Sequence, residues 1–214
     1  MLEEMAAFFN RRVEQYEAHQ LTCIEDAAVF YPFTARCLPL AQGARVLDLG
    51  CGTGLELNEY FALNPSAHVT GIDLAHDMLA VLREKFPPER VTLIEGSYFT
   101  VPLGEACFDA AVSVESLHHF PAQEKAALYA KVRRALKKGG YLIVTDYFAR
   151  SQQEEDAFRQ ELLRLTQGAP RGACYHFDTP LTVQNETQAL HSAGFSSVTL
   201  LGHWGATHTL RAEG

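Results

Sequence analysis

Short apolar segments alternate with amphipathic helical segments through the middle of the chain, and this alternation restricts the fold more than any other feature. We predict strands at 45–49, 68–74, 90–96, 108–116 and 141–148. Near-continuous apolar runs of this kind are typical of parallel strands that helices bury on both faces. No run approaches the roughly 18 apolar residues of a membrane span, so the pattern indicates an α/β protein without a membrane segment.

The two ends of the chain follow a different pattern. Residues 3–40 carry apolar positions at helical spacing, so we predict a helical cover at the N-terminus. In the C-terminal part we predict a polar helix at about 152–167 and a second helix that Thr182 caps. The few residues between two further strands, 197–202 and 206–212, permit an antiparallel hairpin but no parallel crossover. The predicted fold class is α/β, with a doubly wound, mostly parallel seven-stranded sheet, an antiparallel edge strand and N-terminal helical cover.

Charge and cysteine usage limit the partners that the chain can have. Its formal net charge of −8 argues against a broad nucleic-acid footprint, because phosphate binding needs clustered basic residues. The most basic stretch, KVRRALKK at 131–138, lies at the end of a predicted helix, where it complements the helix dipole. The N-terminus has no apolar signal core, and the five cysteines form no CxxC pair. We therefore expect a cytoplasmic protein without nucleic-acid or membrane partners; its oligomeric state is not indicated.

Three glycines at alternate positions, Gly50, Gly52 and Gly54, follow the first predicted strand directly. Gly50 and Gly52 can adopt positive φ and leave room for a ligand that a Cβ would exclude. In an open α/β sheet the ligand binds beyond the carboxyl ends of the strands, at the switch point beside the first strand. The second strand ends at Asp73, whose carboxylate can accept hydrogen bonds from both hydroxyls of a ribose. The turn therefore predicts a cofactor that carries an adenosine.

NAD and a free nucleotide are the alternatives for that ligand. The NAD fingerprint is G-x-G-x-x-G, and its third glycine would fall on Leu55. A phosphate-binding P-loop needs Gly-Lys-Ser/Thr, which does not follow the turn. The observed spacing is G-x-G-x-G preceded by Asp48, which matches neither pattern.

Four segments in this order and spacing, VLDLGCGTG, GIDLAHDML, FDAAVSVESLHHF and ALKKGGYLIVTD, resemble the class I S-adenosylmethionine-dependent methyltransferases. The resemblance covers roughly residues 40–150, and the antiparallel end of the predicted sheet also fits that family. It implies S-adenosylmethionine as the cofactor and a single methyltransferase domain over 1–214. We expect this domain to contain a helical cover at 1–40, a cofactor-binding core at 41–150, and a substrate-side lid with closing strands at 151–214.

The resemblance also implies roles for residues around the cofactor. Asp48 would organise the glycine turn and reach the cofactor's ammonium group, and Asp73 would hold the ribose hydroxyls. EGSY lacks the acidic residue that relatives often carry after the glycine, so Ser97 or a backbone carbonyl would meet the adenine amino group. Tyr16 or Tyr31 can form an aromatic wall near the sulfonium, because a ring face favours a cation; packing within its own helix is the alternative for Tyr16. The predicted cofactor-binding residues are Tyr16, Asp48, Gly50, Gly52, Asp73, Leu74, Met78, Ser97, Tyr98 and Val114.

The methyl acceptor is expected over the carboxyl ends of the fourth and fifth strands. Methyl transfer is an in-line displacement that needs alignment, desolvation and, for a protonated acceptor, a base. The predicted catalytic residues are Glu115, His118, His119 and Tyr147, and packing or loop ordering is the alternative for the two histidines. Because neighbouring side chains point to opposite sides in regular structure, we expect no metal site at the histidine pair.

Residues for acceptor specificity are expected in the irregular stretch CYHFDTP, at 174–180. It carries Tyr175, His176 and Asp178, and binding residues concentrate in such loops. The chain lacks the Asp/Asn-Pro-Pro-Tyr/Phe motif of nucleobase amino-methylating relatives and a Pro-Cys nucleophile. We therefore predict an S-adenosylmethionine-dependent methyltransferase acting on a small-molecule acceptor. A non-catalytic cofactor-binding regulator of the same fold is the alternative, and an NAD-dependent oxidoreductase is disfavoured by Leu55.

Overall fold

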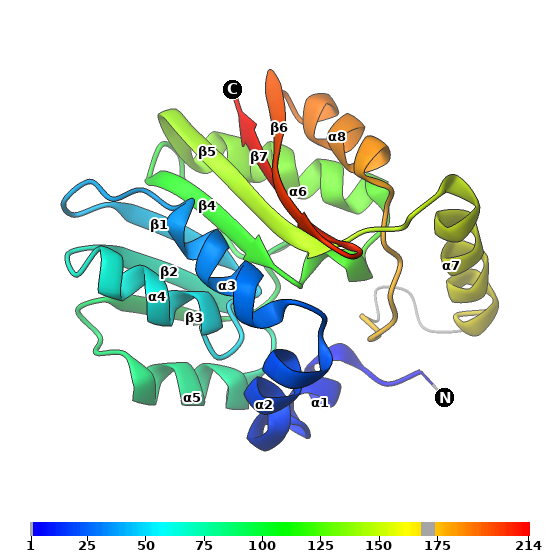
Figure 1. Cartoon of the computed structure of the whole chain (residues 1–214), viewed down its shortest axis with the longest axis horizontal. Coiled ribbons are helices and arrows are strands. Elements are labelled where there is room, and N and C mark those ends of the chain that lie inside the picture. The colour runs from blue at the N-terminus through cyan, green and yellow to red at the C-terminus, as the bar shows by residue number, and fades with distance from the viewer. Residues whose placement is uncertain (1, 168–173) are drawn as a thin grey trace.

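The computed structural model describes residues 2–167 and 174–214, which are built around one seven-stranded sheet (Figure 1). Strands β1 to β5 run parallel, β7 runs antiparallel to β5, and β6 pairs antiparallel with β7 at the edge. The order across the sheet is β3-β2-β1-β4-β5-β7-β6, so the predicted fold class is confirmed. The strands are β1 (Arg45–Leu49), β2 (His68–Asp73), β3 (Val91–Glu95), β4 (Phe108–Val114), β5 (Leu136–Tyr147), β6 (Ser197–Trp204) and β7 (Thr207–Glu213).

Helices cover both faces of the sheet (Figure 1). One apolar cluster lies under α3 (Ala27–Arg36), α4 (Leu55–Leu63) and α5 (His76–Lys85). The other lies under α6 (Ala122–Ala135) and α8 (Val183–Ser192). The strands between these clusters are buried on both sides, which explains their near-continuous apolar sequence.

Three features concern the helices of the C-terminal half of the chain. The Thr182 hydroxyl accepts a hydrogen bond from the Asn185 amide at 3.2 Å, so the predicted cap of α8 is confirmed. A buried ion pair joins α6 to α8, with the Lys125 ammonium 2.6 Å from the Glu186 carboxylate. Helix α7 (Gln152–Leu165) extends away from the sheet, and all its side chains are at least partly exposed (Figure 1).

The first part of the N-terminal cover, predicted to be helical, is divided into two short helices. It consists of α1 (Met5–Asn10) and α2 (Val13–Cys23), which a turn at Arg11 and Arg12 separates. Helix α1 packs against α5, whereas α2 packs against α3. The turn therefore allows the two halves of the cover to bury against different neighbours.

The boundary between α6 and β5 also differs from the prediction. Lys137 and Lys138, which end the basic stretch expected at the end of the helix, lie within β5, which begins at Leu136 rather than at residue 141. Helix α6 ends at Ala135, because Leu136 has extended backbone and pairs with Phe108 of β4. A Cβ on Gly140 would lie 3.1 Å from the backbone oxygen of Asp109, a tight contact, so the close approach of the two strands favours glycine there.

The centre of the sheet positions the candidate site. β1 and β4 are neighbours, and the connections that follow them lead to opposite sides of the sheet, which makes their carboxyl ends a topological switch point. The glycine turn follows β1, and the short 3₁₀ helix η1 (Leu117–His119) follows β4. Over the part of the chain that the structure describes, no helix has both the length and the apolarity to cross a membrane.

Candidate active site

The glycine turn after β1 is held tightly against the loop after β4. Gly50 has a φ of +76°, and a Cβ there would lie 2.0 Å from Oγ of Ser116. The Gly50 amide donates to the carbonyl of Ile72 in β2 at 2.8 Å. The turn is therefore fixed on both sides, and glycine is required at this position by backbone conformation and by space.

Asp73, not Asp48, organises the turn. One carboxylate oxygen of Asp73 accepts the Gly52 amide and the other accepts the Ala75 amide, both at 2.8 Å. The two carboxylate oxygens of Asp48 have no hydrogen-bond partner among the described residues. The prediction that Asp48 orders the turn was wrong, because its side chain points into the interior, where it is 1% exposed.

Asp48 instead shares the interior with a second acid, Glu56 of α4. Burial and the neighbouring Glu56 raise the pKa of Asp48, and burial raises the pKa of Glu56 as well. Two buried carboxyl groups side by side avoid ionising together, so the pair favours a shared proton or a bound cation.

A narrow cleft of about 40 Å³ lies over the turn. Ser97 and Val114 do not line it, and the Ser97 hydroxyl instead accepts the Phe99 amide at 3.3 Å. Tyr31 does not line it either, whereas Tyr16 reaches it from α2. The predicted residues that line the cleft are Tyr16, Gly50, Gly52, Asp73, Leu74, Met78 and Tyr98. The remaining lining residues are Met5, Phe9, Glu115, Ser116 and His119.

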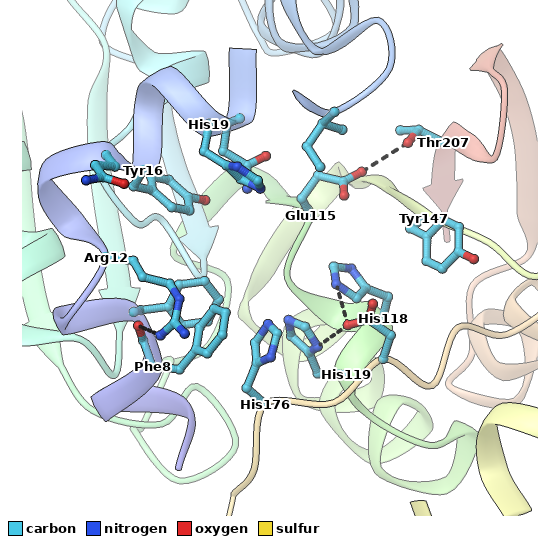
Figure 2. Close-up of a pocket in the computed structure, with 15 residues that line it drawn as sticks. Phe8, Arg12, Tyr16, His19, Glu115, His118, His119, Tyr147, His176 and Thr207 are labelled. Carbon is cyan, nitrogen blue, oxygen red and sulfur yellow. Dashed lines mark hydrogen bonds and ion pairs between the residues drawn. The ribbon is translucent and has the colours of Figure 1, made fainter. Parts of the chain in front are cut away.

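A larger cavity of about 630 Å³ adjoins the cleft (Figure 2). The two share four wall residues, which are Phe9, Tyr16, Glu115 and His119. All four predicted catalytic residues, Glu115, His118, His119 and Tyr147, line the cavity. The N-terminal cover supplies most of the residues that were missed, namely Phe8, Phe9, Arg12, Gln15, His19, Gln20 and Ile24.

The cavity wall combines segments that are far apart in the chain. His176 and Asp178 line it as expected, whereas Tyr175 does not. Residues 168–173, within the segment expected to form the lid, lie outside the described residues. His176 stacks on Phe8 of α1, with ring centroids 3.5 Å apart, so the C-terminal segment and the N-terminal cover meet over the cavity.

The histidine pair is arranged differently from the alternation expected for a strand. His118 and His119 lie in η1, where the backbone turns, and their ring centroids are 4.0 Å apart. Nδ1 of His118 lies 2.5 Å from Oδ1 of Asp146. The amide of Leu117 donates to the other Asp146 oxygen at 2.8 Å, which fixes that carboxylate beneath the pair.

Burial and neighbouring charges set the protonation of the cluster. Burial disfavours a charged His118 ring, but Asp146 outweighs this and raises its pKa to about 9. Burial and the neighbouring His118 lower the pKa of His119 to about 4. Burial and the neighbouring Asp146 raise the pKa of Glu115 to about 8. Burial also disfavours a charged Asp178, but the hydrogen bond with His119 outweighs this and lowers the pKa of Asp178 to about 2. Near neutral pH the cluster thus combines carboxylates, an imidazolium and neutral groups within one cavity wall.

Glu115 also has an unusual backbone. It is a non-glycine residue with a φ of +49°, and the Thr207 hydroxyl donates to its carboxylate at 3.3 Å. Left-handed backbone at such a residue is strained, and strain of this kind concentrates at functional sites. Figure 2 shows the Glu115 carboxylate facing Thr207, and Glu115 lines both the cleft and the cavity.

Comparisons with known proteins agree on one family. Residues 46–140 match the model of a methyltransferase domain. A sterol 24-C-methyltransferase of Gibberella zeae is 26% identical over 167 residues, which are 76% of this chain and 42% of that protein. The chain thus spans less than half the length of this relative.

Solved structures match over nearly the whole chain. A Nostoc punctiforme protein, provisionally assigned as an O-methyltransferase, has a TM-score of 0.74 at 22% identity and covers 99% of this chain and 61% of its own. Human N-acetylserotonin methyltransferase, solved in complex with S-adenosylmethionine, has a TM-score of 0.67 at 19% identity. It covers 96% of this chain and 56% of its own. At these identities the structural matches establish the fold.

Proposed function

We propose that this chain, which belongs to the class I S-adenosylmethionine-dependent methyltransferases, binds that cofactor in the narrow cleft and methylates a small molecule in the adjoining cavity. The observation that carries the proposal is the wall shared by cleft and cavity. A methyl group presented at Phe9, Tyr16, Glu115 and His119 would face directly into the cavity. The cofactor, when bound, supplies a methyl carbon on a positively charged sulfur.

The residues of the cleft fit such a cofactor. Gly50 and Gly52 keep the turn free of side chains. Each carboxylate oxygen of Asp73 already accepts one backbone amide, which holds it in place, and can still accept a hydrogen bond from a hydroxyl. The unpartnered carboxylate oxygens of Asp48 are buried directly before the turn, where an ammonium group would compensate them. Leu74 and Met78 provide apolar surface beside the ribose position.

The N-terminal cover must move for this cofactor to enter. The cleft encloses about 40 Å³, whereas ligand pockets are typically about 300–1,000 Å³. Met5, Phe9 and Tyr16 close it from α1 and α2, and Tyr16 lies 3.8 Å from the place of a Cβ on Gly52. We infer that α1 and α2 shift outward when the cofactor binds. The Tyr16 ring would then lie against the sulfonium, where a ring face stabilises a cation.

The cavity supports a small acceptor with an aromatic or apolar body and a polar reacting group. Its volume of about 630 Å³ lies within the range of small-molecule pockets. Phe8, Phe9 and Tyr147 contribute apolar surface, while Glu115 and His118 contribute polar groups to the same wall. We propose that Glu115, His118 and Tyr147 align the acceptor and that His119, whose ring is neutral near pH 7, receives its proton. The cover and the C-terminal segment would exclude water.

Two measurements test this function. Calorimetry should detect binding of S-adenosylhomocysteine and no comparable binding of NAD; tighter binding of NAD would contradict the cofactor assignment. Incubation with methyl-labelled S-adenosylmethionine and metabolite fractions should then yield a labelled small molecule.

Variants connect that product to the cavity. Tyr147→Phe should reduce turnover while the affinity for S-adenosylhomocysteine is unchanged, because Tyr147 lines the cavity and not the cleft. Exposed Glu95→Gln, at the end of β3, is the matched control with unchanged turnover. Tight cofactor binding without a labelled product from any fraction would favour a non-catalytic regulator of the same fold.

A further inference from the structure

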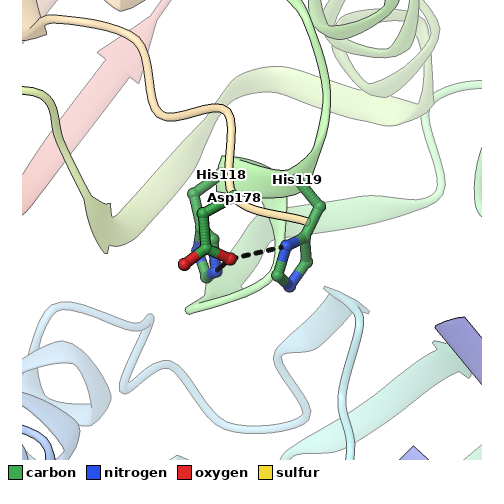
Figure 3. Close-up of side chains that lie close together, drawn as sticks. All are labelled: His118, His119 and Asp178. Carbon is green, nitrogen blue, oxygen red and sulfur yellow. Dashed lines mark ion pairs between the residues drawn. The ribbon is translucent and has the colours of Figure 1, made fainter. Parts of the chain in front are cut away.

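We propose that His118, His119 and Asp178 form a binding site for a divalent transition-metal ion, best suited to zinc, in the wall of the acceptor cavity. Figure 3 shows the three side chains converging from η1 and from the segment before α8. The metal site itself rests on the positions of these side chains, and only its action on a methyl acceptor rests on the proposed function.

The spacing of the ligand atoms fits tetrahedral coordination. Oδ1 of Asp178 lies 3.2 Å from Nδ1 of His119 and 3.6 Å from Nε2 of His118. A tetrahedral zinc ion with bonds of about 2.0–2.1 Å separates its ligand atoms by about 3.3 Å. The three atoms all lie within 4.8 Å of one another, so small side-chain rotations bring them to a common ion.

Asp146 supports this arrangement from behind. Metal-ligating histidines commonly donate their second ring N–H to a carboxylate, which fixes the ring and its tautomer. Nδ1 of His118 contacts Oδ1 of Asp146 at 2.5 Å, while Nε2 of the same ring faces Asp178. Asp146 is itself held by the amides of Leu117 and Tyr147, at 2.8 and 2.9 Å. The carboxylate and ring are therefore arranged before any ion arrives.

The local charge also favours a cation. Asp146 and Asp178 both converge on His118. Among the described residues that line the cavity, Arg12 is the one arginine or lysine, and it pairs with Glu3 at the rim. An ion with two positive charges would offset this surplus of carboxylates.

The open side of the site faces the cavity. Three protein ligands leave a tetrahedral metal one free position, as in catalytic zinc sites. All three ligands line the acceptor cavity, so a hydroxyl or thiol of the acceptor could take that position. A metal ion lowers the pKa of such a group, which is the change that attack on a methyl carbon requires. Imidazole ligands select zinc and its transition-metal neighbours over magnesium and calcium, which prefer oxygen.

A hydrogen-bonded cluster without metal is the competing explanation. Nδ1 of His119 lies 3.3 Å from the carbonyl of Phe177, so this nitrogen already has two possible acceptors, that carbonyl and Asp178. Metal binding would replace these contacts with one coordinate bond. The two explanations differ in whether the cluster retains zinc.

Zinc content separates them directly. The chain, purified without a polyhistidine tag, is dialysed against buffered micromolar Zn²⁺, and bound zinc is measured by elemental analysis. We expect one equivalent of zinc, and a visible Co²⁺ absorption typical of four-coordinate sites, with no competition from excess Mg²⁺. Asp178→Asn should weaken zinc binding at least tenfold, and Asp146→Asn about 10–100-fold.

A surface histidine pair provides the matched control. His203 and His208 stack across β6 and β7, with ring centroids 5.7 Å apart, and could bind zinc adventitiously. His203→Gln should keep the single equivalent. Circular dichroism and thermal unfolding verify that each variant is folded. Absence of zinc and cobalt binding, or equal zinc affinity in wild type and folded Asp178→Asn, would overturn the site and leave the methyl-transfer proposal intact.

Discussion

Replacing Gly50 by alanine tests whether the glycine turn is fixed by its contact with Ser116. At Gly50 φ is +76°, and left-handed backbone costs an L-residue about 1–2 kcal/mol. The new Cβ would also lie 2.0 Å from Oγ and 2.6 Å from Cβ of Ser116, so the loop before η1 would have to shift. Overpacking of this kind costs about 1–3 kcal/mol. We therefore expect Gly50→Ala to lower the free energy of unfolding by about 2–5 kcal/mol.

Gly43→Ala isolates the steric part of this loss. Gly43 has a similar φ of +68°, but a Cβ there would meet no atom within 4 Å. Its substitution should cost only the backbone strain of about 1–2 kcal/mol. Urea unfolding followed by circular dichroism measures both losses, and the melting temperature should fall by about 2–4 °C for each kcal/mol. Adding Ser116→Gly to the Gly50 variant removes both clashing atoms and should recover part of the stability. Equal losses at Gly50 and Gly43 would refute the argument.

Further predictions concern ligand affinity, the buried ion pair and pH. Asp73→Asn should weaken S-adenosylhomocysteine binding by about 1–3 kcal/mol in calorimetry, because charged hydrogen bonds are lost; exposed Glu95→Gln should not change it. Lys125→Met should lower the free energy of unfolding by about 3–5 kcal/mol, because it leaves Glu186 charged and buried; the double change Lys125→Met with Glu186→Leu should cost less than the single change. Burial raises the folded-state pKa of Glu56, so the stability from its protonated form is complete below pH about 4 and is lost as pH rises through the folded-state pKa. The unfolding free energy of wild type relative to that of Glu56→Gln should therefore decrease as pH rises above about 4. A difference independent of pH would contradict this.

The cofactor side of the site could largely be predicted from local sequence. Gly50, Gly52 and Asp73 follow directly from strand ends, and parallel strands bring their carboxyl ends to one edge of the sheet. The side-chain contacts of Ser97 and Asp48 could not be predicted in this way. The direction of a side chain at a strand end depends on the turn that follows it, and neighbouring sequence leaves that direction open.

The acceptor side depended on contacts between distant segments. Asp178 meets His119 across a long stretch of chain, and Phe8 stacks on His176 from the other end of the molecule. The expectation of no metal site assumed the alternation of a strand, whereas His118 and His119 lie in a 3₁₀ turn that brings both rings into the cavity wall. The short-range pattern of ESLHHF contains the residues but no information about that turn.

The sequence alone thus determined the sheet, the glycine turn and the place of Asp73 at the end of β2, because strand burial and backbone conformation are local properties that residue type controls. Tertiary structure decided which residues line the cavity. It placed the N-terminal Phe9 and Tyr16 over the cleft, and it joined His118 to Asp146 and Asp178. These contacts arise from packing among elements with little sequence proximity, where burial and electrostatics act through space rather than along the chain.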